Sequence, residues 1–132
     1  MELASRTDAT ERVAVELSLE PESAGRARAA IAPLRPQAHA SSFDDVRLLV
    51  SELVSDALLV EPQPADGAIN VEAQVLDGVT QVNVRFDRVS LRLPNDKPQP
   101  AEAGWGVYLV QTLATRWSAR REGGSTYVSF EA

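Results

Sequence analysis

The chain has 132 residues, of which 44% are hydrophobic and 24% are charged, a balance that predicts one folded domain with its own core. It contains no cysteine, which excludes disulfides, thiolate metal sites and cysteine nucleophiles and indicates a reducing compartment. Its formal charge of −6 argues against nucleic acid as a partner, and without a signal peptide or a long apolar run we expect a cytoplasmic protein that does not enter the membrane.

The N-terminal part of the chain predicts a loose end, a strand and a helix. Residues 1–12 are charged and lack an apolar run, so we expect them to be flexible and the domain to span 13–132. Residues 13–19 alternate apolar with polar or small side chains, the period-two pattern of a half-buried strand. The segment 23–34 is rich in alanine and arginine and ends before Pro36, which predicts a first helix.

A second helix is predicted over 42–60, where apolar residues recur at helical spacing. Ser42 is its candidate N-cap residue, because a serine hydroxyl can accept a backbone N–H at a helix start. Pro62 and Pro64 follow and cannot continue the helical hydrogen bonds. The apolar stripe of this helix consists of Val46, Leu49, Val50, Leu53, Ala57 and Val60.

A β-hairpin is predicted around Asp77-Gly78, a dipeptide that favours a tight turn between two strands. Apolar and polar residues alternate over 69–75 before the turn and over 80–86 after it. Residues 88–103 contain three prolines and no period, so they predict a long irregular loop of the kind that forms lids.

The C-terminal part of the chain predicts a third helix between Gly106 and Trp117, followed by a last hairpin over 117–130 that turns at a Gly-Gly pair. The resulting order is strand, helix, helix, two strands, loop, helix, two strands. This order predicts an α+β fold, a two-layer sandwich in which three helices cover one face of a mostly antiparallel sheet.

Three acidic residues are candidates for chemistry. Glu52 and Asp56 stand one helical turn apart, so their carboxylates project the same way. A general base beside a carboxylate that holds Mg²⁺ is one interpretation, and a solvated helix face is the other. Asp87 ends a predicted strand, where a carboxylate can accept a hydrogen bond from an amino group or simply terminate the strand.

Glycine pairs and rare side chains give further candidates. Gly104 and Gly106 lie at a predicted helix start, where free backbone N–H groups and the helix dipole attract phosphate, although glycine also serves as a turn former. His39 is the single histidine and has no partner residues for a zinc site. Trp105 and Trp117 bracket the third predicted helix and are interpreted as packing residues.

Three segments together resemble the Bergerat, or GHKL, ATP-binding fold, and most closely the anti-sigma-factor serine kinases of the RsbW and SpoIIAB type. Leu48 to Ala57 resembles the family helix that ends in Glu-Leu-Val-Thr-Asn-Ala, Val84 to Asp87 resembles the strand that delivers its adenine-binding aspartate, and Gly104 to Val110 resembles its Gly-x-Gly-Leu-x-Leu-Val. The order and spacing of the segments agree, and the resemblance covers roughly Val13 to Phe130.

The resemblance implies ATP and Mg²⁺ as cofactors and a single cleft between the sheet and its helices for all site residues. It implies that Glu52 is the base that activates a serine of an anti-anti-sigma partner and that Asp87 contacts adenine. The other implied contacts are Asp56 with the nucleotide and its Mg²⁺, Gly104 and Gly106 with the phosphate lid, and Thr126 with adenine.

The sequence departs from the family pattern at the implied nucleotide site. Asp56 replaces the Mg²⁺-binding asparagine of the family and adds negative charge beside a triphosphate. Val89 replaces a usual glycine and can crowd the nucleotide, and Leu58-Leu59-Val60 replaces basic and histidine residues. These changes predict impaired ATP binding.

The resemblance and its departures together lead to two expected functions. The first is an anti-sigma-factor-like regulatory protein in bacterial partner-switching control of transcription, and the alternative is an active ATP-dependent kinase that phosphorylates an anti-anti-sigma factor on serine. The implied partners are a sigma factor, an anti-anti-sigma protein of the STAS type, or a second copy of the chain in a homodimer. A sensor histidine-kinase fragment fits less well, because the chain lacks a phosphoacceptor helix.

Overall fold

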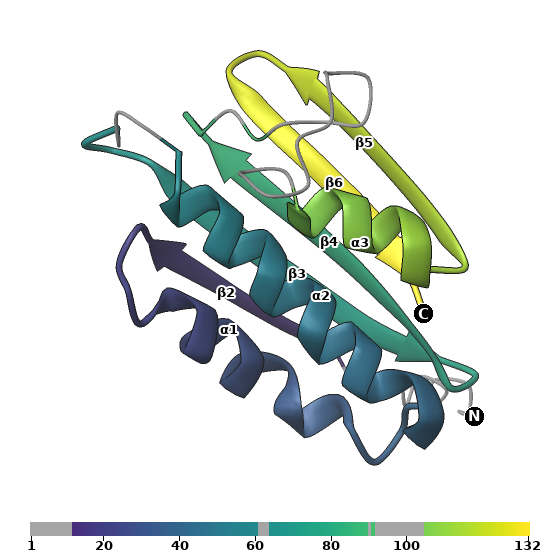
Figure 1. Cartoon of the computed structure of the whole chain (residues 1–132). Coiled ribbons are helices and arrows are strands. Elements are labelled where there is room, and N and C mark those ends of the chain that lie inside the picture. The colour runs from purple at the N-terminus through teal and green to yellow at the C-terminus, as the bar shows by residue number, and fades with distance from the viewer. Residues whose placement is uncertain (1–11, 61–63, 90, 92–104) are drawn as a thin grey trace, which may run out of the picture.

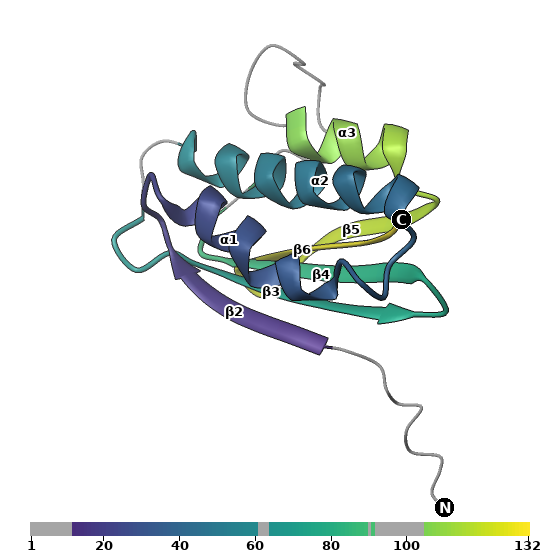
Figure 2. The ribbon, with the colours of Figure 1, turned by 90° about the horizontal axis from the view of Figure 1, so that it is seen from below.

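A computed structural model of the chain describes residues 12–60, 64–89, 91 and 105–132, apart from the side chain of residue 105. It has a layer of helices on one face of an antiparallel sheet, which confirms the predicted two-layer α+β sandwich (Figures 1 and 2). The elements in chain order are β2 (Arg12–Ser18), α1 (Ser23–Ile31), the 3₁₀ turn η2 (Ala32–Leu34), α2 (Ala40–Leu58), β3 (Ala68–Leu76), β4 (Val79–Asp87), α3 (Trp105–Leu113), β5 (Arg116–Glu122) and β6 (Ser125–Glu131).

Two predictions about irregular segments fall mostly outside the described residues. The predicted flexible segment 1–12 lies there except for Arg12, which begins β2. The predicted loop 88–103 is described only at Arg88, Val89 and Leu91.

The described sheet has the strand order β2-β3-β4-β6-β5, and every neighbouring pair is antiparallel (Figure 1). Its helix-free face is polar, and side chains of four strands form a hydrogen-bonded row across it. Arg12 Nη2 donates to Gln74 Oε1 at 2.8 Å, Gln74 Nε2 to Gln81 Oε1 at 2.7 Å, and Gln81 Nε2 to Glu131 Oε2 at 3.1 Å. This row of hydrogen bonds links β2, β3, β4 and β6 to one another across the open face of the sheet.

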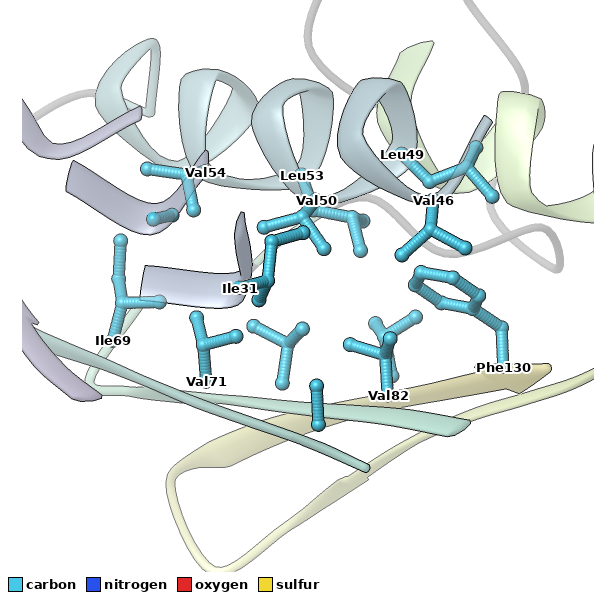
Figure 3. Close-up of a cluster of buried hydrophobic side chains, with 14 of the residues drawn as sticks. Ile31, Val46, Leu49, Val50, Leu53, Val54, Ile69, Val71, Val82 and Phe130 are labelled. Carbon is cyan, nitrogen blue, oxygen red and sulfur yellow. The ribbon is translucent and has the colours of Figure 1, made fainter. Parts of the chain in front are cut away.

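The core lies between α2 and the sheet, as the two periodicities of the sequence predicted. The stripe of α2 points down onto alternate residues of the strands (Figure 3), and α1 packs beside α2 on the same side (Figure 2). Val60 lies beyond the end of α2 and is only partly buried. Fully buried members of this core include Ile31, Phe43, Val46, Leu49, Val50, Leu53, Val54, Ile69, Val71 and Phe86.

The hairpin between β3 and β4 turns where the sequence predicted. Asp77 has φ 54° and Gly78 has φ 82°, the positive values that a tight two-residue hairpin turn requires. The backbone N–H of His39 donates to the carbonyl of Gly78 at 2.9 Å, which docks the start of α2 onto this turn. The single histidine therefore has a structural position at the junction of the two layers.

The structure corrects three details of the helices. Helix α2 begins at Ala40, so the predicted N-cap at Ser42 is wrong, and the Ser42 hydroxyl instead donates to the carbonyl of His39 at 3.3 Å. Helix α3 ends at Leu113, earlier than predicted, because the chain must turn back into β5. Trp117 lies on β5 with 37% of its surface exposed and is less well packed than predicted.

Candidate functional site

Asp56 lies near the C-terminal end of α2, at the point where α2 meets the first turn of α3. Asp56 is only 2% exposed. The backbone N–H of Gly106 donates to its Oδ2 at 2.6 Å, a short charge-assisted hydrogen bond. Asp56 is therefore a buried carboxylate bound to a helix N-terminus, and the interpretation as part of a solvated helix face does not apply to it.

Gly106 allows α3 to approach α2 closely. A Cβ atom at this position would lie 2.9 Å from the carbonyl oxygen of Glu52, closer than real Cβ atoms come, and 3.0 Å from Asp56 Oδ2, which is tighter than most real contacts. The absence of a side chain thus places the amide of Gly106 against the carboxylate. Gly104, the other glycine of the predicted pair, lies outside the described residues.

Glu52 lies one helical turn before Asp56 on α2, and its backbone carbonyl is part of the close approach to Gly106. Glu52 is partly exposed, whereas Asp56 is buried. The structure therefore brings together three of the predicted site residues, Glu52, Asp56 and Gly106, at one junction of the helix layer.

Asp87 lies on the other face of the sheet. Its Oδ1 accepts hydrogen bonds from Ser125 Oγ at 2.7 Å and Arg85 Nε at 3.0 Å, and Asn70 Nδ2 lies 3.4 Å from its Oδ2. The hydrogen bond from Ser125, and then the bond and charge of Arg85, lower the pKa of Asp87 below its ordinary value. The structure does not bring this carboxylate together with Glu52 and Asp56.

The alternation of β4 contains the signal for this placement. Phe86 is buried against the helices, and successive side chains of a strand point to opposite faces. Asp87 must therefore point away from the helix layer. The common cleft predicted for Asp87, Glu52 and Asp56 is therefore wrong, because Asp87 ends a strand whose alternation turns it to the open face.

Thr126 is on the helix side of β6 and is 2% exposed. Its Oγ1 donates to the carbonyl of Val89 at 3.1 Å. Val89 and Leu91 are 2% and 0% exposed and belong to the core, and Arg121 Nη2 donates to the carbonyl of Leu91 at 2.6 Å. The chain just after β4 thus lies across the end of the sheet at Thr126.

Val89 and Leu91 are core residues within the segment 88–103, which was predicted to be an irregular loop. Arg88, at the end of β4, has φ 65°, a left-handed conformation that is uncommon for a residue with a side chain. This turn shifts the alternation by one residue, so apolar side chains recur at 84, 86, 89 and 91. The apolar residues at 89 and 91 were visible in the sequence. Which face of the sheet they point to depended on the turn at Arg88.

The acidic residues of the described part of the chain are dispersed. Nowhere in it do three or more histidine, aspartate or glutamate side chains gather as they would around a metal ion. Among the described helices, none combines the length and the apolar character needed to cross a membrane.

Comparison with known proteins yields a match in fold. No family model and no curated protein matches the chain. A crystal structure of the RsbU and RsbW domains of Rv1364c from Mycobacterium tuberculosis superposes with a TM-score of 0.66 at 20% sequence identity. The match covers 92% of this chain and 32% of that chain, so this chain spans about a third of its length. The chain therefore has an RsbW-like fold, as its three sequence segments predicted.

Proposed function

We propose that the chain is an anti-sigma-factor-like regulatory protein that acts in bacterial partner switching and binds ATP weakly or not at all. Its RsbW-like fold supports the class of protein. The observation that supports a loss of nucleotide binding is the buried Asp56 carboxylate. It accepts a hydrogen bond from the N–H of Gly106 at the start of α3, a donor that a phosphate would need.

The electrostatics at this position oppose a bound phosphate. A helix N-terminus favours an anion by about 0.3–1 kcal/mol. Two like charges about 4 Å apart near a protein surface repel by roughly 4 kcal/mol. The repulsion from Asp56 outweighs the attraction of the helix, so a triphosphate is disfavoured where the resemblance implied one.

The same carboxylate is poorly suited to the implied Mg²⁺ ion. Mg²⁺ prefers several oxygen ligands, including waters, in an open octahedral arrangement. Asp56 is buried, and its Oδ2 already accepts the short bond from Gly106. A catalytic step through a metal at this position is therefore not part of the proposed function.

Calorimetric titration with ATP and Mg²⁺ tests this proposal. We expect a flat trace with ATP for the wild-type chain, and tighter binding of inorganic triphosphate, which has no base, by Asp56→Asn, since the amide keeps an acceptor for Gly106 and loses the charge. Asp45→Asn makes the same change elsewhere on α2 and should stay flat. A saturable wild-type isotherm that Asp87→Ala abolishes would contradict the proposal.

The proposed partners are a sigma factor and an anti-anti-sigma protein of the STAS type. If the domain works as a binding module, complexes with the purified partners form equally well with and without ATP. Analytical ultracentrifugation of the chain alone and of each mixture measures this, and it also tests the proposed homodimer. Complexes that form only with ATP would favour the kinase instead.

The alternative function is the active serine kinase, and the observation in its favour is Glu52. This residue stays partly exposed one turn from Asp56, where a base could meet a serine. Transfer of the γ-phosphate of ATP to a STAS protein, lost in Glu52→Gln and retained in Asp45→Asn, would establish this activity.

A further inference from the structure

The base end of the implied nucleotide site is filled by the chain itself. The resemblance assigns Asp87 and Thr126 to adenine, and of the two only Thr126 lies on the helix side of the sheet, where its hydroxyl donates to the carbonyl of Val89 at 3.1 Å. The side chains of Val89 and Leu91 are buried in the same core as the helices and the sheet. We call Val89 and Leu91 the plug.

The plug is anchored by segments on either side of β4, whose neighbours in the sheet are β3 and β6. On one side, the N–H of Arg88 donates to the carbonyl of Gly124 at 3.0 Å, and the guanidinium of Arg121 donates to the carbonyl of Leu91 at 2.6 Å. On the other side, Val89 lies against Gly67, where an added Cβ would come within 3.2 Å of Val89 Cγ2. These contacts join segments that are far apart in the sequence.

We propose that Val89 and Leu91 act as an internal substitute for a nucleobase and close the base end of the site against any flat ligand. A ligand that entered there would have to expel both side chains into water. For two apolar side chains of this size, the penalty corresponds to a loss of affinity of roughly one hundred to ten thousand fold.

This inference rests on the proposed function, because it explains why the site is closed, but it concerns a different end of that site. Asp56 acts on the phosphate end, near the start of α3. The plug acts on the base end, near Thr126. A nucleoside without phosphates therefore probes the plug alone.

The test measures adenosine binding by equilibrium dialysis and by the shift in melting temperature. Leu91→Ala shortens the plug, and Leu34→Ala is its control, because both leucines are 0% exposed and Leu34 lies in η2. Truncating a buried apolar side chain leaves a cavity that a small flat molecule can enter. We expect Leu91→Ala to bind adenosine at least about tenfold more tightly than the wild type or Leu34→Ala.

If Leu91→Ala does not fold, the smaller truncation Val89→Ala gives the answer, with Val82→Ala as its control. The proposal is overturned if the folded plug variant binds adenosine no better than its control, or if the wild type already binds adenosine as tightly. Neither result depends on the Asp56→Asn titration with inorganic triphosphate, so the two proposals can fail separately.

Discussion

Thr80 and Thr126 are two buried threonines, and among the described residues only one of their hydroxyls is hydrogen-bonded. Both face the core, with exposures of 0% and 2%. The Thr126 hydroxyl donates to Val89, whereas Thr80 Oγ1 is a buried oxygen without a hydrogen-bond partner in the described part of the chain. A buried polar group costs free energy unless it is hydrogen-bonded.

Replacing each threonine by valine should therefore change stability in opposite directions. We expect Thr80→Val to raise the free energy of unfolding by about 1 kcal/mol, and Thr126→Val to lower it by about 1 kcal/mol because the Val89 carbonyl loses its donor. Urea denaturation of the two variants measures both. Destabilisation by Thr80→Val would show that its hydroxyl has a partner after all.

Asp87 contributes a stability that depends on pH. Its pKa is lowered in the folded chain, first by the hydrogen bond from Ser125. A group whose folded pKa lies below its unfolded value of about 3.9 stabilises the fold above that pH, and this contribution is lost as the pH falls through the folded pKa.

Ser125→Ala removes the largest cause of the lowered pKa. We expect the variant to be less stable than the wild type at neutral pH, and the difference to shrink as the pH falls below about 4. Urea unfolding at a series of pH values, with the Asp87 carboxyl followed by NMR, measures this. A difference that stays constant in acid would indicate that Ser125 acts through packing and not through the charge.

At the scale of elements, the crossing of α2 and α3 depends on the missing side chain of Gly106. A glycine inside a helix is ordinarily less favourable than alanine by about 0.5–1 kcal/mol. At this crossing a Cβ would meet Glu52 O at 2.9 Å and Asp56 Oδ2 at 3.0 Å, both of them parts of α2. Steric conflict should outweigh helix propensity there.

We expect Gly106→Ala to destabilise the chain by about 1–3 kcal/mol, as overpacking in a close interface does. Gly25→Ala in α1 is the matched control, because its nearest neighbour would be Arg28 Nη2 at an ordinary 3.6 Å. That variant should gain about 0.5–1 kcal/mol from helix propensity. Thermal unfolding of both variants measures the contrast, and equal gains would mean that α3 moves aside easily.

At the scale of the whole molecule, one apolar cluster joins the helices to the sheet. Val50 of α2 and Val128 of β6 are both 0% exposed members of it. Small domains with one core usually unfold in a single cooperative transition. Circular dichroism and tryptophan fluorescence should therefore report the same midpoint.

Val50→Ala and Val128→Ala should each lower that shared midpoint and reduce the free energy of unfolding by about 2 kcal/mol. Both probes must shift together in each variant, although one change is in a helix and the other in a strand. Separate midpoints for the two probes would show that the layers unfold independently.

Local patterns in the sequence were sufficient for most of the architecture. The helical stripe of α2, the alternation in β3 and β4 and the Asp77-Gly78 turn act over a few residues, so they can be recognised without knowing the rest of the fold. The same local order carried the resemblance to the RsbW-type domain, whose fold the chain shares. The predicted common cleft for Asp87, Glu52 and Asp56 was wrong, although the alternation of β4 already contained the signal that Asp87 points to the open face.

Only the tertiary structure decided what the site residues touch. Asp56 meets Gly106, 50 residues later in the chain, because α2 and α3 cross there, and the spacing of either helix alone contains no information about that crossing. Val89 and Leu91 enter the core because Arg88 adopts a left-handed turn, which shifts the alternation of these two side chains by one residue. Hydrogen-bond partners and burial depend on elements that are remote in sequence, and these are the properties that separate an open site from a closed one.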